Sequence, residues 1–304
     1  MTPDLVFSLP GNEAMAASLA SRLGAETGTL ESRHFPDGES YLRLVTPVAG
    51  RHVLFVCTLD RPDAKFLPLL FAAATARELG AMTVCLAAPY LAYLRQDRRF
   101  QAGEAVTSRQ AAKLLGDAFD RLVCVDPHLH RYHDLAEIFA IPALALHAAP
   151  LLASWVAASV ERPLLIGPDR ESEQWVSAVA KRAGAPFAVL DKIRHGDRDV
   201  EILLPELRQW EGHTPVLMDD IISTGRTMLE AIRLLRVQGF ARPVCLAVHG
   251  LFADGADMAL KAAGARVITC NTVPHACNAI DVSELLASGF LNPAAATAPS
   301  TGRS

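Results

Sequence analysis

Short apolar runs alternate with longer amphipathic stretches along most of the chain. The apolar runs predict β-strands at residues 5–8, 52–57, 83–87, 122–125, 164–167, 187–190, 216–218, 244–248 and 267–270. Between them, hydrophobic residues at helical spacing predict helices at residues 13–23, 64–79, 108–115, 171–183, 228–238 and 255–263. Because short apolar strands separated by helices are typical of βαβ units, the pattern predicts an α/β fold with mainly parallel sheets.

The alternation of strands and helices runs through the chain twice, with a break near residues 141–149. A chain of 304 residues is long enough for two domains of roughly 100–200 residues each. We therefore expect one domain at residues 1–146 and a second at residues 147–292. Residues 293–304 are mostly Ala, Pro, Ser, Thr and Gly, which predicts a disordered tail.

Composition and charge restrict the partners that the protein can have. Hydrophobic residues make up 51% of the chain, which excludes disorder as a global state. The net charge is −4, whereas proteins that bind nucleic acids or membrane surfaces usually carry a basic face. The longest apolar runs, residues 66–76 and 145–160, are shorter than a membrane span of about 18–20 residues. With no basic region ahead of an apolar stretch near Met1, we expect a cytoplasmic protein.

The six cysteines show no CxxC spacing, and five of them lie inside short aliphatic runs, while Cys277 follows a turn that contains proline. This distribution favours small buried side chains in a reducing compartment over a disulfide framework or a zinc site.

The strongest chemical signal is at residues 215–227, which read PVLMDDIISTGRT. A buried strand delivers two adjacent carboxylates, Asp219 and Asp220, and a small polar loop then leads into a helix. Loop amides and a helix N-terminus can hold a phosphate group, with added donors from the hydroxyls of Ser223, Thr224 and Thr227. The carboxylates could hold ribose hydroxyls or a divalent cation. The alternative is a capped helix after a strand that ends in acidic residues, although a buried carboxylate pair is costly without a partner.

This segment resembles the loop that binds phosphoribosyl pyrophosphate (PRPP) in phosphoribosyltransferases and ribose-phosphate pyrophosphokinases. Five further motifs precede this segment in the chain. In order, they are FPDGE at residues 35–39, YLRQDRR at 93–99, DPH at 126–128, PD at 168–169 and DKIR at 191–194. Together they make the chain resemble the ribose-phosphate pyrophosphokinase family from residue 4 to about residue 290. The chain is most similar to the archaeal-type class of this family, in the segments RQDRRFQAGEA, PDRES and DDIISTG.

The resemblance implies two phosphoribosyltransferase-type domains and a transferase of nucleotide biosynthesis. In the family, the pyrophosphoryl group of ATP moves to the anomeric hydroxyl of ribose 5-phosphate, which gives PRPP and AMP, and the kinase needs Mg²⁺. The family often completes the adenine pocket with a neighbouring subunit, so the resemblance also implies a homo-oligomer, at least a dimer.

The family pattern assigns roles to individual residues. The ATP-binding residues are Phe35, Asp37, Glu39, Arg95, Gln96, Asp97 and His128. The ribose 5-phosphate residues are Asp219, Asp220, Ser223, Thr224, Gly225, Arg226 and Thr227. The metal ligands are His128, Asp169, Asp219 and Asp220. Lys192 and Arg194 are implied as catalytic cations that reach the transferring phosphates from a mobile loop.

The sequence departs from the family pattern at two loop positions. Ser223 stands where an acidic residue is common, and Arg226 stands where Gly or Cys is usual. Two alternatives therefore stay open: a phosphoribosyltransferase that consumes PRPP, and a non-catalytic subunit that binds PRPP. The residues on the ATP side, such as Arg95, His128 and Lys192, favour the synthetase because neither alternative requires them. The motifs FPDGE and DKIR also have simpler interpretations. Asp37 and Glu39 could be acidic residues of an ordinary turn, and Lys192 and Arg194 could be surface charges.

Overall fold

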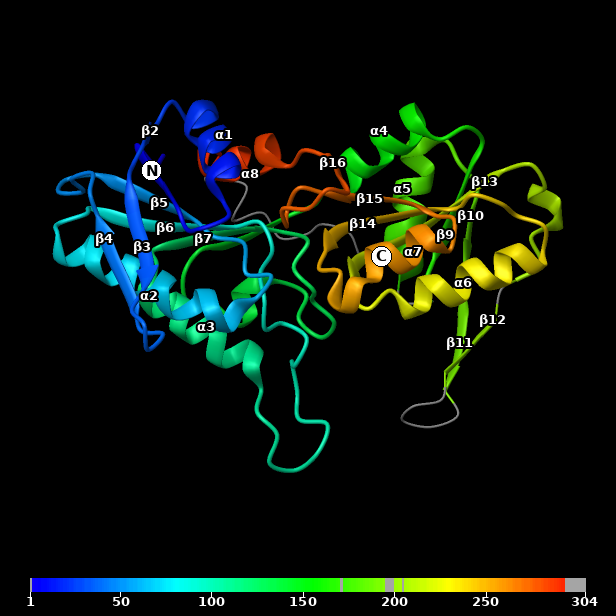
Figure 1. The fold of residues 1–304 in the computed structure, drawn as a ribbon, viewed down its shortest axis with the longest axis horizontal. Helices are drawn as coiled ribbons and strands as arrows, with labels where there is room; N and C mark the ends of the chain where they lie inside the picture. The colour runs from blue at the N-terminus through cyan, green and yellow to red at the C-terminus, as the bar shows by residue number, and fades with distance from the viewer. Residues whose placement is uncertain (1, 170–171, 195–199, 204, 293–304) are drawn as a thin grey trace. The chain divides into compact units, whose positions relative to one another are not determined.

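The computed structural model describes residues 2–169, 172–194, 200–203 and 205–292, with the backbone alone in residues 191–194 and 200–203. The chain forms two compact units (Figure 1). Unit 1 consists of the described residues up to Leu146 together with those from Ser283 onward. Unit 2 consists of those in His147–Val282. The predicted tail at residues 293–304 lies outside the described residues.

Unit 1 is built on a parallel sheet in the order β2-β1-β5-β6-β7-β8. Its strands are β1 (Leu5–Ser8), β2 (Glu26–Thr27), β5 (His52–Val56), β6 (Thr83–Ala88), β7 (Arg121–Val125) and β8 (Ala143–Leu146). Helices α1 (Glu13–Leu23), α2 (Pro62–Glu78) and α3 (Thr107–Ala118) connect them, and β3 (Leu30–His34) pairs with β4 (Ser40–Leu44) as a separate antiparallel hairpin. Successive residues of β7 are all buried, so both faces of the sheet are covered, which explains why its strands are continuous apolar runs.

Unit 2 is built on a second parallel sheet in the order β10-β9-β13-β14-β15-β16. Its strands are β9 (Pro163–Gly167), β10 (Phe187–Val189), β13 (Thr214–Ile222), β14 (Val244–Gly250), β15 (Arg266–Cys270) and β16 (Asn278–Ile280). Its helices are α4 (Ala149–Ser159), α5 (Glu173–Ala183), α6 (Arg226–Val237) and α7 (Ala256–Ala262), and its antiparallel hairpin joins β11 (Asp191–Arg194) to β12 (Val200–Leu203).

The two units share one topology. In each sheet, the strand that comes first in the chain lies beside the strand that comes second. On the other side of the first strand lie the later strands of the sheet, which follow one another in chain order. In each unit an antiparallel hairpin is inserted at the same point of this order. The chain is therefore a structural duplication that carries no strong internal sequence repeat.

The last helix, α8 (Ser283–Leu291), does not stay with the sheet that precedes it. It packs against α1, β7 and β8 of unit 1. Arg22 Nε donates to Ser283 Oγ at 3.1 Å, and Gly289 lies so close to Val123 that a Cβ there would be 2.7 Å from its methyl group. The expected second domain at residues 147–292 is thus wrong at its end, because α8 buries Phe290 and its neighbours in unit 1.

The predicted strands and helices are all present among the described residues, with shifted ends. Those that the pattern missed are β2, β3, β4, β8, β11, β12, β16, α4 and α8. Most of these strands are short, exposed or polar, so they lack the apolar run that marks a buried strand. β13 runs from Thr214 to Ile222 and not from 216 to 218, because its pairing with β14 continues through the two aspartates.

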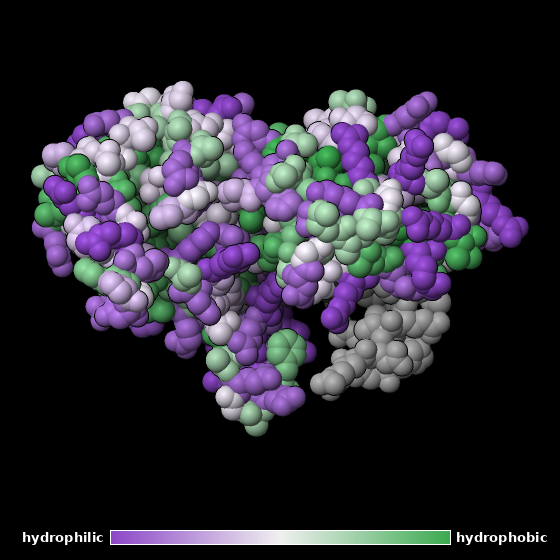
Figure 2. All heavy atoms as spheres, viewed as in Figure 1, coloured by the Kyte–Doolittle hydropathy of each residue, from purple (hydrophilic) through white to green (hydrophobic). Residues whose placement is uncertain are grey.

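Hydrophilic residues cover much of the face drawn in Figure 2, with hydrophobic residues between them. No helix in the described part of the chain is both long enough and apolar enough to cross a membrane.

Candidate active site

The segment that the sequence predicts to bind phosphate, residues 223–227, follows the carboxyl end of β13 in unit 2 and runs into α6; it is called the phosphate loop below. The N–H groups of Leu251 and Phe252 donate to the Ile222 carbonyl at 3.0 and 3.1 Å, which fixes the end of the strand. Gly225 then turns the chain with φ at +68° and precedes α6, where Leu229 N–H donates to the Gly225 carbonyl at 2.9 Å. Because no side chain caps α6, the N–H groups of its first turn and its partial positive charge face the loop.

Asp219 and Asp220 are the last polar residues of β13, and both are partly buried. Asp219 Oδ1 accepts a hydrogen bond from the Asp220 N–H at 2.9 Å, which orients its carboxylate. Neighbouring residues of a strand alternate between the two faces of the sheet, so the two carboxylates leave β13 on opposite sides. One carboxylate can therefore bind a sugar hydroxyl while the other binds a cation or a different part of the ligand.

Asp169 follows β9, the strand that pairs in parallel with β13. Both strands therefore deliver carboxylates at the same edge of the unit 2 sheet. Asp169 Oδ1 accepts from the Ser172 N–H at 3.1 Å, and the Ser172 hydroxyl donates to the Asp169 carbonyl at 2.6 Å. A Cβ at Gly167 would lie 2.6 Å from Ser172 Oγ, so glycine is needed there for the turn to close.

In unit 1, the loop after β6 is tied to the segment after β7. Arg131 Nε lies 3.5 Å from Asp97 Oδ1, and the Tyr132 hydroxyl donates to the Asp97 carbonyl at 3.4 Å. The side chain of Asp97 is only 5% exposed, and its carboxylate lies beneath the half-exposed guanidinium of Arg131. Arg95 is exposed and Gln96 is partly exposed, so they are the members of this motif that can reach a ligand directly. Arg131 and Tyr132 are residues that sequence reasoning missed.

Tyr93 sets the direction of this loop. Its backbone φ is +65°, and its hydroxyl donates to the Asp63 carboxylate. Partial burial and the Asp63 carboxylate together raise the pKa of Tyr93 to about 12. The tyrosine therefore stays protonated and anchored at neutral pH.

His128 lies in the segment that leaves β7 after Asp126, whose φ is +34°. Its ring packs edge-on against the ring of His130, with centroids 4.5 Å apart. His128 is partly buried, whereas His130 and His133 are exposed.

The tip of the β3–β4 hairpin carries Phe35, Asp37 and Glu39. Glu39 N–H donates to Asp37 Oδ1 at 3.2 Å, so the Asp37 carboxylate also closes the turn. The Arg33 guanidinium lies 4.9 Å from the centre of the Phe35 ring and 4.1 Å from that of Tyr41. Phe35 is still 40% exposed, so the tip presents one aromatic face to solvent. Sequence reasoning missed Arg33 and Tyr41, which support that face.

Lys192 and Arg194 lie on β11, where they pair with Ile202 and Val200 of β12. The expectation that both belong to a loop is wrong for their backbone, because the pairing continues the hairpin through Arg194. Residues 195–199, the rest of the expected loop, lie outside the described residues.

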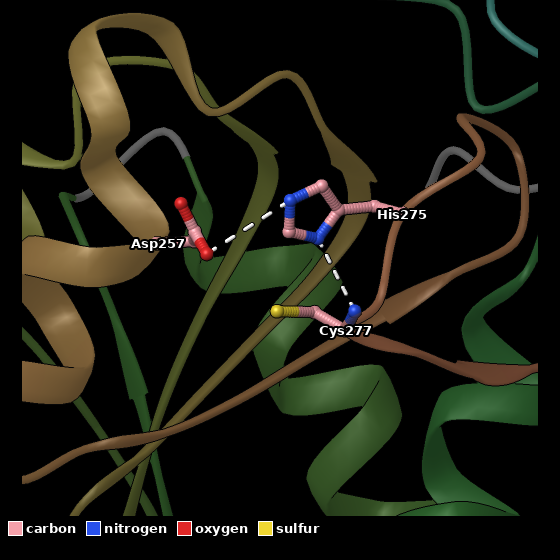
Figure 3. Close-up of side chains that lie close together, drawn as sticks. All are labelled: Asp257, His275 and Cys277. Atoms are coloured by element: carbon pink, nitrogen blue, oxygen red, sulfur yellow. Dashed lines mark hydrogen bonds and ion pairs between the residues drawn. The ribbon is translucent and has the colours of Figure 1, made fainter.

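Side chains that could hold a metal ion also lie together elsewhere in unit 2. Among the described residues, one group of three or more possible ligands has its ligand atoms within 4.8 Å of one another, and it consists of Asp257, His275 and Cys277 (Figure 3). Within unit 2, the predicted metal residues Asp169, Asp219 and Asp220 do not form such a group.

Comparison with known proteins relates these features to a family. Residues 5–118 match the N-terminal domain of ribose phosphate pyrophosphokinase, and residues 134–285 match the phosphoribosyl transferase domain. The ribose-phosphate pyrophosphokinase of Methanopyrus kandleri is 36% identical over 292 residues, which cover 95% of this chain and 99% of that protein. That of Sulfurisphaera tokodaii is 34% identical over 266 residues, covering 85% and 90%.

The likeness extends to the three-dimensional structure. Phosphoribosylpyrophosphate synthetase from Mycobacterium smegmatis superposes with a TM-score of 0.82 at 25% sequence identity, covering 95% of this chain and 98% of that chain. The two parallel α/β units define a duplicated protein of the phosphoribosyltransferase type. The chain belongs to the ribose-phosphate pyrophosphokinase family, and its similarity to enzymes from archaea confirms the resemblance to the archaeal-type class.

Proposed function

We propose that this enzyme transfers the pyrophosphoryl group of ATP to the anomeric hydroxyl of ribose 5-phosphate, so that PRPP and AMP are formed. The observation that supports this most directly is the phosphate loop at the carboxyl end of β13, in a chain that matches the family along both units. Binding sites of parallel α/β sheets lie at this edge. The ATP-binding residues then belong to unit 1 and the sugar phosphate residues to unit 2.

The phosphate loop would hold the 5-phosphate. The N–H groups of the first turn of α6 donate to the phosphate oxygens, and the hydroxyls of Ser223, Thr224 and Thr227 add donors. Arg226, the first residue of α6, is exposed and adds a positive charge that can bind two oxygens at once. Ser223 in place of an acidic residue and Arg226 both make the loop more positive, which favours an anionic phosphate.

The carboxylates ahead of the loop would hold the ribose ring. One of the two carboxylates, Asp219 or Asp220, accepts hydrogen bonds from ribose hydroxyls, which fixes the anomeric oxygen in one place, and the other offers its oxygens to a cation. Holding two reactants in line contributes much of the acceleration in phosphoryl transfer, because the transition state needs positioning and charge neutralisation.

Mg²⁺ is the cofactor that we propose, and the residues fit it. The carboxylates of Asp169, Asp219 and Asp220 offer the hard oxygen ligands that Mg²⁺ prefers, and water completes its coordination. His128 would orient the nucleotide-bound ion from unit 1. When bound, Mg²⁺ neutralises charge on the ATP phosphates.

The remaining residues would orient ATP. Phe35 offers its exposed ring to the adenine, and the exposed guanidinium of Arg95 binds phosphate oxygens. Lys192 and Arg194 would bring positive charge to the transferring phosphates. The tip of the β3–β4 hairpin would serve the adenine pocket of a neighbouring copy, so we propose a homo-oligomer of at least two chains, which light scattering can test.

The test is AMP release from ATP by the purified chain with Mg²⁺, measured with ribose 5-phosphate present and left out. The expected result is equimolar AMP and PRPP that depend on both substrates. If the protein instead releases pyrophosphate from PRPP in the presence of a base, it is a phosphoribosyltransferase. If it binds PRPP and turns over neither pair of substrates, it is a regulatory subunit.

A further inference from the structure

We propose that Asp257, His275 and Cys277 form a zinc-binding site in unit 2, separate from the residues proposed for ATP and ribose 5-phosphate. Their carboxylate, imidazole and thiol offer one ligand atom each, all within 4.8 Å of one another. Asp257 comes from α7, and the other two come from the turn between β15 and β16, so the tertiary structure brings them together (Figure 3).

The set of donor atoms selects the metal. Zinc binds sulfur, nitrogen and oxygen ligands in a tetrahedral arrangement, and three protein ligands leave a fourth position for water. Mg²⁺ prefers oxygen ligands alone and rarely accepts a thiolate. The cluster therefore distinguishes zinc from the Mg²⁺ that we propose for the reaction.

The turn that carries two of the ligands is held in place before any metal binds. The side chain of Asn278 accepts from the His275 N–H at 2.8 Å and donates to Thr269 Oγ1 at 2.9 Å and to the Cys270 carbonyl at 2.8 Å. The His275 ring also packs against Phe252, with centroids 4.4 Å apart. Because these contacts fix the turn, metal binding needs little ordering of the backbone.

The cluster already stabilises a positive charge. Lys261 Nζ donates to Asp257 Oδ2 at 3.1 Å, and this bond, followed by one to the Cys277 thiol, raises the pKa of Lys261. Partial burial acts to raise the pKa of Asp257, but its bonds with Lys261 and the Met258 N–H lower it overall. Asp257 is therefore ionised at neutral pH. The Lys261 side chain is 42% exposed, so its ammonium can swing into solvent when a metal ion takes its place.

The protons of the site can be followed through binding. Nδ1 of His275 accepts from the Cys277 N–H at 3.2 Å, so the ring proton is on Nε2, which lies 3.9 Å from Asp257 Oδ2. For zinc to bind Nε2, this proton moves to Nδ1 and the bond from Cys277 N–H is lost. The Cys277 thiol then becomes a thiolate, so that one proton is released for each zinc ion bound.

The experiment measures zinc binding to the full chain with Mg²⁺ in excess, by calorimetry and by competition with a coloured chelator. Cobalt(II) is then used in place of zinc, because a thiolate ligand gives it a charge-transfer absorption. The expected result is one zinc ion per chain and this absorption. Cys277→Ser and His275→Gln should each weaken zinc binding by at least about 100-fold, more than the loss of a supporting group costs.

Two further variants separate a metal site from a simple hydrogen-bond cluster. Lys261→Gln removes the competing cation and should tighten zinc binding by about twofold or more, as expected for the loss of one exposed ion pair. Cys245→Ser changes another buried cysteine of unit 2 and should leave zinc binding unchanged. Since the His275 side chain is 29% exposed, His275→Gln is expected to fold. If Cys277→Ser fails to fold, zinc binding by His275→Gln decides whether these residues form a metal site.

The proposal is overturned if the wild-type chain binds no zinc under these conditions or if its cobalt form lacks the thiolate absorption. It is also overturned if His275→Gln binds zinc as tightly as the wild type, because the ion is then held by other groups.

Discussion

Gly225 allows a sharp test of the phosphate loop, because its backbone is in the left-handed region. A Cβ at this position would lie 3.4 Å from Ala256 Cβ and 3.5 Å from a methyl group of Leu260, which are ordinary contact distances. Gly225→Ala therefore introduces no severe overlap. Its cost comes from the φ of +68°, which is roughly 1–2 kcal/mol for a residue with a side chain.

Gly184 is the matched control in the same unit. It ends α5 with a φ of +65°, and a Cβ there would have no heavy atom within 4 Å. Gly184→Ala should therefore lower the free energy of unfolding by the same roughly 1–2 kcal/mol. Gly184 precedes β10, whereas Gly225 follows β13, so the two glycines lie at opposite edges of the parallel sheet.

The two variants should differ in function. Alanine at position 225 favours a right-handed backbone and moves the N–H groups at the start of α6, and a shift of about 1 Å can cost about 100-fold in rate. We expect Gly225→Ala to lower kcat/KM for ribose 5-phosphate by at least about tenfold, while Gly184→Ala keeps the wild-type value. Urea unfolding and steady-state AMP release on both proteins give the two quantities.

If both variants lose the same stability and both keep the wild-type kcat/KM, the conformation of the loop does not matter for the sugar phosphate and its proposed role is wrong. A much larger stability loss for Gly225→Ala than for Gly184→Ala would show that the contacts with α7 are tighter than the distances indicate.

Four other predictions follow from the site and from burial. Asp219→Asn combined with Asp220→Asn should abolish PRPP formation with an unchanged circular dichroism spectrum; normal turnover would exclude their proposed role. His128→Ala should raise the Mg²⁺ concentration needed for half-maximal rate more than the KM for ribose 5-phosphate, and the reverse pattern would contradict a metal role. Lys192→Ala should lower kcat by about 10²–10³-fold with little change in KM, and Lys192→Arg should restore it only in part; an unchanged kcat would make it a surface charge. Burial raises the pKa of Cys57 from 9.0 to about 12, so its contribution to stability is complete below pH 9.0 and is lost as the pH rises toward 12. Measured by urea unfolding, the free energy of unfolding should fall by up to about 1.4 kcal/mol per pH unit in this range, and it should fall less steeply in Cys57→Ala. The same pH dependence in both proteins would disprove the linkage.

The alternation of apolar runs and helices was enough to predict the fold class. Strands such as β6, β7 and β14 are buried at almost every position, so each had to be a continuous apolar run, and its sequence shows this directly. The segment that we propose to bind phosphate could also be located from sequence, because Gly225 and the polar residues around it are adjacent in the chain. Roles for Lys192, Asp169 and His128 came from the order of motifs, and they remain predictions.

Other features depend on partners that are distant in the chain. Strands β3 and β4 contain no continuous apolar run, and their pairing with each other becomes visible only in the folded chain. Asp97 was expected to contact ATP, but its burial against Arg131 depends on two loops that meet only in the folded unit.

The sequence alone determined the βαβ pattern and the position of the phosphate loop, since both result from local spacing of apolar and small polar residues. Only the tertiary structure decided that α8 joins unit 1 and that β13 extends through Asp219 and Asp220. It also brought Asp257 of α7 beside His275 and Cys277. In each of these cases the stabilising contact joins segments far apart in the chain, and the free energy of such contacts depends on how whole elements pack.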